Sequence, residues 1–549
     1  MGDATFKFRL AMLAGVCVTA CAAVPAPARP AESAYVALDP RGAWPDVPRI
    51  PLAPRLTSLK GKRIYLVKSW PSNSGFEGVT AKLAATLRAR FPDAVVTIKD
   101  RNERYSEDDP KLWAEMKANA DAFIYIVAAS SSTTSYAFKW TAKLEKMGLP
   151  GVVVNFDALN SVGDTTNARE GAQVRRSAFT YPPERMDPKT YDAAMEKAIA
   201  ALTVPLTADE TRTGVIKAVH PPEIAATGTL DQVEKAFYDK GLTDGLPIIP
   251  PTRERVADML KGTRHAPDEV VAQAFMPESL KATVKTVAIN GVMAGCGPEH
   301  LPVLLATVEA YQKYNLNSML RSTNSFSFMQ VVNGPIRQQL KMNGATNAVG
   351  PGNRSNSCMG RALRLFIVNL GGGVPDVNLM AVIGNVSSQG FMFAENEEQS
   401  PWEPLAADHG FKRGDNTLTF FSGGWGHAGN YGLGTTLADV PGDLARFQIS
   451  TGATVIISPA RAAELTAKGM TKQQVKDYFW ENAYHTLGEL RAGERFRETP
   501  DTQGKPDSTH IQVYKKGTID VVVAGNDASP MMQAWAMYRP QTVSIDKWR

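Results

Sequence analysis

Cys296 is the residue most suited to chemistry, and it stands between two glycines in "VMAGCGPEHLPV". A thiol near the start of a helix is a candidate nucleophile, because the positive end of the helix dipole favours the thiolate. His300 can serve as its base, and Glu299 can orient that histidine. A second interpretation is a small structural cysteine at the end of a buried strand, since "TVAINGVMAG" is expected to be a strand. Both interpretations stay open.

A glycine loop, "NAVGPGNRSNSCMGRALRL", leads into a second predicted helix. Asn353, Arg354 and Ser355 lie where the helix begins, and its free N–H groups together with Arg354 suit a carboxylate or phosphate. A tight turn with a solvated arginine is the alternative. Cys358 falls one turn inside the helix and is expected in the core. The loop is neither a Walker motif nor a dinucleotide fingerprint.

Acidic residues cluster after an aromatic strand in "FMFAENEEQSPWEPL". A carboxylate beside an aromatic ring can have a raised pKa and act as a general acid or base. Asn396 adds an amide able to hold an oxyanion, and His427, in a glycine-rich aromatic stretch, is a candidate pocket residue. A solvated cluster and a hard-metal site are alternatives, and no spacing indicates zinc. The acidic candidates are Glu395, Glu397, Glu398 and, with lower weight, Glu403.

Strands and helices alternate from residue 60 to 156, which predicts parallel βαβ units in a doubly wound sheet. Ligands on such sheets bind at the carboxyl ends of the strands. The run "AASSSTTS" lies at that edge and includes Ser130 and Thr133. Its hydroxyls suit either helix capping or binding of an anionic or polar ligand. A nucleophilic serine is least favoured, because this region contains no histidine.

The N-terminus has the pattern of an export signal: Lys7 and Arg9 precede the apolar run "LAMLAGVCVTA". "VTAC" resembles a lipoprotein cleavage box, which predicts lipidation of Cys21, and ordinary signal-peptide cleavage is the alternative. The expected location is the periplasm of a bacterium, soluble or anchored through that lipid. After processing only Cys296 and Cys358 remain, and in an oxidising compartment two thiols can pair.

The chain has 549 residues, enough for two or more domains with full cores. We expect an α/β protein in which a Rossmann-like domain precedes a larger mixed α/β domain. The predicted segments are a signal at 1–21, a flexible tether at 22–55, the first domain at 56–205, a linker at 206–240 and the second domain at 241–549.

The chain has 60 basic and 55 acidic residues, which nearly balance and are interleaved along it. This argues against a nucleic-acid partner. A small-molecule substrate and a possible homo-oligomer are the expected partners. No motif demands a particular cofactor, and the cofactor stays unknown.

Several segments in order resemble the UGSC family: "TDGLPIIPPT", "VMAGCGPEHLPV", "VNGPI", "GPGNRSNSCMGRALRL" and "FAENEEQSPWEPL". The family is named for a selenocysteine/cysteine-Gly-Ser-Cys motif after a buried strand of its N-terminal α/β domain, and the resemblance implies thiol or selenol redox chemistry there. Here Ser130 and Thr133 take the two redox positions, and Tyr136 stands where a further cysteine is often found. Hydroxyls cannot cycle through sulfenate or disulfide states, so redox chemistry at this motif is not expected.

Two functions are therefore expected. The first is an exported enzyme acting on a small, carboxylated or aromatic molecule, with lyase or hydrolase chemistry favoured over thiol-dependent redox. The second is a ligand-binding or sensing lipoprotein that has lost its chemistry. The substitutions at Ser130 and Thr133 favour the second, whereas the retained Cys296 and Arg354 favour the first.

Overall fold

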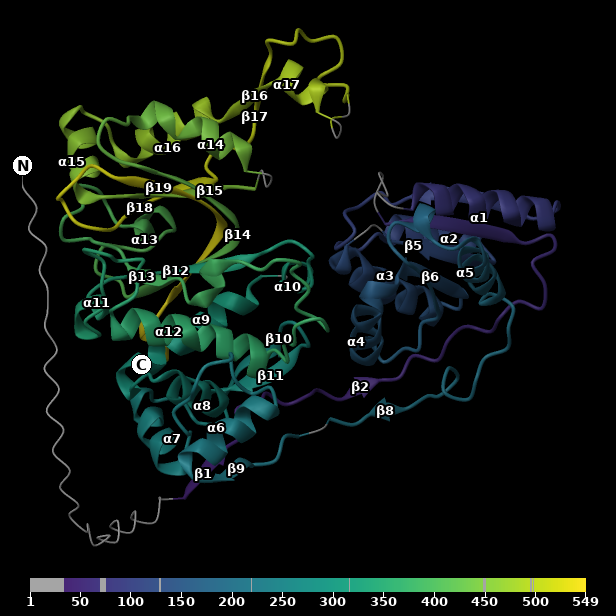
Figure 1. The fold of residues 1–549 in the computed structure, drawn as a ribbon, viewed down its shortest axis with the longest axis horizontal. Coiled ribbons are helices and arrows are strands. Elements are labelled where there is room, and N and C mark those ends of the chain that lie inside the picture. The colour runs from purple at the N-terminus through teal and green to yellow at the C-terminus, as the bar shows by residue number, and fades with distance from the viewer. Residues whose placement is uncertain are drawn as a thin grey trace, which may run out of the picture.

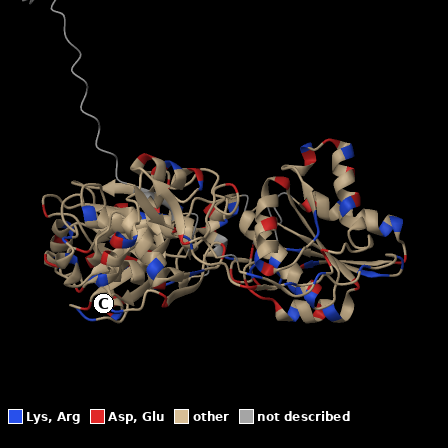
Figure 2. Ribbon diagram, turned by 90° about the horizontal axis from the view of Figure 1, so that it is seen from below, with Lys and Arg blue, Asp and Glu red and all other residues tan. Residues whose placement is uncertain are grey.

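The fold is that of a computed structural model, which describes residues 34–69, 76–127, 130–218, 220–314, 316–447, 451–493, 496 and 498–549. The predicted signal at 1–21 and the start of the predicted tether lie outside the described residues. The chain forms two units connected by two extended segments that run side by side (Figure 1). Acidic and basic residues are interspersed on both units (Figure 2).

The smaller unit contains a five-stranded parallel sheet with strand order β4-β3-β5-β6-β7. Because the order reverses beside the first strand, helices cover both faces, as in a doubly wound fold. The predicted strands and helices of this region are confirmed. The strands are β3 (Arg63–Lys68), β4 (Val95–Asp100), β5 (Ala122–Ile126), β6 (Gly151–Phe156) and β7 (Arg176–Phe179), and the helices are α1 (Glu77–Arg90), α2 (Pro110–Asn119), α3 (Ser131–Lys146), α4 (Asn160–Glu170) and α5 (Pro188–Ala200).

β5 and β6 are buried along their whole length, as expected of central parallel strands covered on both faces. β5 leads directly toward α3, so the Ser-Thr run begins at the carboxyl edge of the sheet. The strand order reverses between β3 and β5, which makes this edge the crevice where doubly wound sheets bind ligands.

The larger unit is built on a six-stranded mixed sheet of order β13-β12-β14-β19-β15-β18. Apolar clusters lie on both faces of this sheet, and the largest fills the space between it and helices α8, α9 and α12. The strands are β12 (Ser327–Asn333), β13 (Met392–Ala394), β14 (Thr417–Tyr431), β15 (Ala453–Ile457), β18 (Ile519–Val523) and β19 (Met532–Ser544).

Helices surround the mixed sheet, and Figure 1 shows α14, α15 and α16 on one side of it and α9 and α12 on the other. The helices are α6 (Leu230–Asp239), α7 (Arg253–Met259), α8 (Val284–Ala294), α9 (Leu301–Gln312), α10 (Asn317–Leu320), α11 (Ile336–Gln339), α12 (Arg354–Leu365), α13 (Leu405–Asp408), α14 (Pro441–Arg446), α15 (Pro459–Ala467), α16 (Lys472–Asn482) and α17 (Leu487–Ala492). Within the described residues, none of the helices combines the length and apolar character needed to span a membrane.

The chain enters the larger unit before it forms the smaller one. β1 (Tyr35–Leu38) pairs antiparallel with β9 (Ile224–Gly228), and β2 (Val47–Pro48) pairs with β8 (Val215–Ile216) along the two connecting segments. Ala37 and Leu38 are buried in the main core of the larger unit. The tether prediction is therefore wrong from Tyr35 onward, and the predicted linker at 206–240 contains β8, β9 and α6.

The expected strand "TVAINGVMAG" is instead helix α8. Thr283 and Thr286 form a capping box at its start, and Gly295 ends it in the left-handed conformation with φ of 88°. Nearly all of its residues are buried, so the helix has no polar face that would reveal a period of 3.6 residues. A short apolar run of this kind cannot be assigned to a helix or a strand by periodicity.

The remaining strands form two short antiparallel pairs. β10 (Val270–Phe275) pairs with β11 (Leu280–Thr283), and the loop between them faces the smaller unit. β16 (Tyr484–Thr486) pairs with β17 (His510–Gln512) in the projecting arm that Figure 1 shows beside α17.

Candidate functional sites

Cys296 lies directly after α8, and Cys358 lies in the second turn of α12. The Cys296 thiol contacts the Cys358 sulfur, with a distance of 2.7 Å between the two Sγ atoms. Both residues are buried, with 8% and 5% of their surface exposed. The placement of Cys358 in the core is as predicted. Burial, followed by the neighbouring Cys358, raises the pKa of the Cys296 thiol well above its usual value, which disfavours the thiolate that nucleophilic catalysis needs.

His300 joins this cluster but does not contact the Cys296 sulfur in any hydrogen bond of the described residues. Its Nδ1 accepts a hydrogen bond from the Gly297 N–H over 3.0 Å, so the ring proton is on Nε2. That nitrogen lies 3.0 Å from the Ser355 hydroxyl and donates to it, while the hydroxyl donates to the Leu340 carbonyl. Burial lowers the pKa of His300 and keeps the ring neutral. This network holds the loop in place rather than accepting a proton from a thiol.

The Glu299 side chain is 57% exposed, and one of its carboxylate oxygens lies 3.4 Å from His300 Nδ1. Since the lone pair of Nδ1 already accepts the Gly297 N–H, Glu299 can bond this atom only if the ring is protonated. The predicted relay from Glu299 through His300 to Cys296 is therefore absent from the described contacts.

The predicted anion anchor at the start of α12 serves to cap two helices. The Asn353 side chain accepts the Asn356 N–H as the N-cap of α12. The Arg354 guanidinium donates to the Gly295 carbonyl over 3.0 Å, which places its charge at the C-terminal end of α8, where the helix dipole favours a cation. The Ser355 hydroxyl accepts the hydrogen bond from His300 Nε2. Cys296, His300 and Ser355 thus come together in a buried cluster, with the exposed Arg354 at its edge.

The acidic segment lies on the other side of α11. Glu397 accepts hydrogen bonds from Asn333 and the Gly334 N–H and pairs with Arg337 over 3.1 Å. Glu398 is exposed and pairs with the same arginine, whose hydrogen bonds lower the pKa of Glu398. Glu395 is fully buried and accepts the Leu405 N–H.

Desolvation raises the pKa of Glu395, which is the direction predicted for a carboxylate in this aromatic segment. Asn396 donates to the Gly525 carbonyl over 2.9 Å and also bonds Gln399. These contacts hold the loop against the sheet, and no three acidic, His or Cys side chains of the described residues group as metal ligands. His427 falls in β14, and its side chain is outside the described part of the chain.

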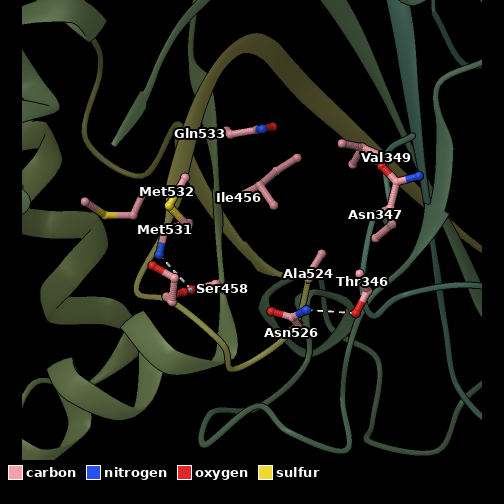
Figure 3. Close-up of a pocket in the computed structure, with 13 residues that line it drawn as sticks. Thr346, Asn347, Val349, Ile456, Ser458, Ala524, Asn526, Met531, Met532 and Gln533 are labelled. Atoms are coloured by element: carbon pink, nitrogen blue, oxygen red, sulfur yellow. Dashed lines mark hydrogen bonds between the residues drawn. The ribbon is translucent and has the colours of Figure 1, made fainter. Parts of the chain in front are cut away.

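A neutral pocket of about 270 Å³ opens beside the end of β15 and the start of β19 (Figure 3). Ser458 accepts the Met531 N–H at one wall, and Asn526 donates to Thr346 at another. The wall contains hydroxyls, amides, methionines and no titratable side chain. It can bind a neutral molecule but supplies no acid, base or nucleophilic thiol.

A second pocket of about 310 Å³ lies between the two units. Its wall on the smaller unit comes from α3 and the end of α4, and its wall on the larger unit comes from the loop between β10 and β11. The connecting segment that contains β2 forms a third side. The lining residues are Pro45, Asp46, Val47, Pro48, Tyr136, Lys139, Arg169, Glu170, Met276 and Ser279.

The two predicted residues of the Ser-Thr run lie just behind this cleft. The Ser130 hydroxyl bonds that of Ser132, and the Thr133 hydroxyl donates to the Ser130 carbonyl over 2.8 Å. Neither residue lines the cleft. Tyr136 and Lys139 follow Thr133 at intervals of three residues, so this helix face turns into the cleft wall.

The cleft contains charged side chains, and not all of them have a partner of opposite charge among the described residues. Arg169 lies 3.5 Å from Glu170 and 3.8 Å from Glu278, and it donates to the Ser135 hydroxyl. Asp46 pairs with Lys217 over 2.9 Å. Lys139 lies 5.0 Å above the Trp140 ring and has no ion pair among the described residues. An anion entering the cleft therefore meets one unmatched ammonium group.

A buried arginine holds the two walls together. Arg321 is fully buried and bonds Thr165 of the smaller unit, the Pro277 carbonyl and Glu278. Burial and the nearby Arg169 lower its pKa to about 10, so it stays charged at neutral pH. Two guanidinium groups thus share Glu278 behind the cleft, which makes this region favourable to anions.

The doubly wound unit and its connecting segments define the class of the protein, an α/β protein whose parallel-sheet unit shares a cleft with the larger unit. Residues 36–208 match the model of the UGSC family. The matched range contains the Ser-Thr run, Tyr136, Lys139 and Arg169, whereas the cysteine pair lies outside it. No curated protein and no solved structure matches the chain.

Sequence reasoning missed the cleft. Tyr136 was singled out only as a departure from the family motif, and Lys139 and Arg169 were not considered. The available signal was the spacing of Tyr136 and Lys139 on one face of a helix that follows a buried strand. The opposite wall comes from a loop more than a hundred residues away, for which the sequence contains no comparable signal.

Proposed function

We propose that the protein binds a small aromatic carboxylate in the cleft between its two units. The observation that carries this proposal is the Lys139 ammonium, which has no ion pair within the described residues, beside Tyr136 in a cleft to which both units contribute. Ligand sites of proteins occur preferentially at such domain interfaces and have volumes from about 300 Å³ upward. The cleft volume of about 310 Å³ therefore suits a molecule of one ring and one acidic group.

Each part of such a ligand has a counterpart in the wall. The carboxylate pairs with Lys139, and the Ser279 hydroxyl can donate a further hydrogen bond. The ring packs on Tyr136 and on the thioether of Met276, since sulfur–aromatic and aromatic–aromatic contacts are both favourable. Arg169 and Arg321 add positive potential behind this wall.

Titration of the full chain with benzoate, measured by calorimetry, tests the proposal. Benzamide has the same shape without the charge, and cyclohexanecarboxylate has the charge without the aromatic ring. We expect benzoate to bind more tightly than either. A charge-assisted hydrogen bond contributes about 1.5–3 kcal/mol, so Lys139→Met should weaken benzoate binding about tenfold or more.

Lys146→Met is the matched control, because Lys146 is exposed on the same helix and does not line the cleft. Tyr136→Ala should also weaken benzoate binding, whereas Tyr136→Phe, which keeps the ring, should change it little. The proposal fails if benzoate does not bind, or if Lys139→Met and Lys146→Met bind it equally.

Lyase- or hydrolase-type turnover stays a prediction of the sequence. The hydrogen bonds of His300, Glu397 and Asn396 support structural roles for these residues rather than an acid–base set around Cys296. A reaction in the cleft would have Asp46, Tyr136, Lys139 and Glu170 as its acid–base groups. Turnover that is lost in Cys296→Ala while benzoate binding persists would favour the enzyme over the binding protein.

Export to the periplasm, with lipidation at Cys21, is part of the proposed function. The basic residues and the apolar run before Cys21 support it, as does the lipoprotein-like sequence "VTAC". An exported ligand-binding protein would meet its carboxylate outside the cytoplasm.

A further inference from the structure

The cysteine pair has no part in the proposed binding function, and its surroundings fix the two helices that carry it. Arg354, at the start of α12, bonds the carbonyl of Gly295, directly before Cys296. Beyond the end of α12, Asn369 donates to Asn290 of α8 over 2.8 Å. α8 is therefore tied to the chain on both sides of Cys358, by bonds at Gly295 and at Asn290.

The two sulfur atoms meet at the centre of this arrangement. The left-handed Gly295 ends α8 and turns the chain, so that Cys296 faces the second turn of α12. Cys358 approaches from that turn, 62 residues later in the chain. Among the described residues, no hydrogen bond gives either thiol a basic partner. The two sulfur atoms contact each other instead. The sulfur atoms are already within 2.7 Å, so a disulfide between them needs only a further small approach.

We propose that Cys296 and Cys358 are a disulfide modification site that reversibly staples α8 to α12. The oxidant is a small-molecule disulfide such as oxidised glutathione. One protein thiol loses its proton and attacks the oxidant, which forms a mixed disulfide and releases one glutathione thiolate. That thiolate takes up the proton.

The second protein thiol then attacks the protein sulfur of the mixed disulfide, the protein disulfide forms, and the second glutathione leaves as a thiol. In total, two protein thiols are oxidised and one glutathione disulfide is reduced to two thiols.

The staple would tie helices that are distant in the chain but adjacent in the main core. A disulfide that closes a loop of this length restricts the unfolded chain, so the oxidised protein should unfold at a higher urea concentration than the reduced one. Because the thiols are buried, reaction in the native state should be slow and should accelerate when the protein is unfolded.

Peptide mapping of the full chain gives a direct test. The protein is equilibrated with glutathione buffers of increasing oxidised fraction, quenched with acid, alkylated in denaturant and digested with trypsin. We expect fragments 286–313 and 355–361 to appear joined, with the mass of two hydrogen atoms lost, and to separate after treatment with dithiothreitol. Cys17 and Cys21 fall in a different fragment.

Urea unfolding of wild-type and Cys296→Ala/Cys358→Ala protein provides the control. The midpoint of the wild type should rise in the oxidised buffer, whereas that of the double variant should be the same in both buffers. The proposal is overturned if both fragments remain alkylated at every ratio, if each carries its own glutathione, or if either is joined to the fragment with Cys17 and Cys21. These outcomes do not depend on benzoate binding, so this proposal and the proposed function fail separately.

Discussion

The Arg321 guanidinium donates to the Thr165 hydroxyl over 3.0 Å, and this bond joins the larger unit to the smaller one behind the ligand cleft. Arg321 also pairs with Glu278, which is itself buried and bonds Asn378. The charge of Glu278 is thus compensated from both units, by Arg321 on one side and by Arg169 on the other. The orientation of the cleft walls depends on this group of buried charges.

Arg321→Met should destabilise the protein strongly. The substitution keeps much of the side-chain volume but leaves Glu278 buried beside the more distant Arg169 alone. Breaking a buried ion pair from one side costs about 3–5 kcal/mol, and we expect a loss of this size in urea unfolding. Arg253→Met is the control, because Arg253 and its partner Glu223 are 56% and 53% exposed and their ion pair should contribute about 1 kcal/mol or less. Equal losses in the two variants would contradict this account of the interface.

Glu397→Ala tests whether the acidic segment is structural. It removes the acceptor for the Gly334 N–H and leaves the exposed Glu398 as the acidic partner of the buried Arg337. We expect a loss of about 3–5 kcal/mol in the free energy of unfolding. Glu398→Ala should cost about 1 kcal/mol or less, since that side chain is 51% exposed. If Glu397→Ala unfolds like the wild type, the structural assignment is wrong.

The smaller unit could be predicted from the sequence because its signals are local. β5 and β6 are short apolar runs, and the helices between the strands have the length of parallel crossovers. Cys296, His300 and Arg354 could also be singled out as candidates, from motifs separated by about sixty residues. What could not be predicted was how these groups satisfy one another, because the Gly297 N–H that sets the tautomer of His300 is a backbone group present at every position.

The pairing of β1 with β9 shows a second limit. Tyr35–Leu38 follows a stretch rich in proline and alanine, which predicts a tether, yet its partner strand lies almost two hundred residues later, beyond the whole smaller unit. Pairing across an inserted domain has no local pattern. The cleft has the same character, since Lys139 and Ser279 meet only when both units are complete.

Lipidation at Cys21 predicts membrane attachment of the exported protein. Cys21→Ala, expressed in a Gram-negative host, should move the protein from the membrane fraction to the soluble periplasmic fraction, because the acyl chains of a lipoprotein supply its membrane affinity. Cys17→Ala should leave fractionation unchanged, and mass spectrometry of the mature N-terminus should show a lipid-modified Cys21. An unmodified N-terminus in a soluble periplasmic protein would support ordinary cleavage, and an intact Met1 would contradict export.

His300 predicts how stability depends on pH. Burial lowers its pKa in the folded protein, so below the ordinary histidine pKa of about 6.5 the unfolded chain binds a proton that the folded chain excludes. The stabilising contribution of the neutral ring is complete above that value and is lost as the pH falls toward the folded pKa. Urea midpoints measured from pH 7.5 down to pH 5 should therefore decrease, and part of the decrease should disappear in His300→Gln. His409 is partly buried and desolvation also lowers its pKa, so His409→Gln should remove a separate part. If both variants retain the full decrease of the wild type, neither ring is held neutral by burial, and the role of His300 as a neutral donor to Ser355 falls with it.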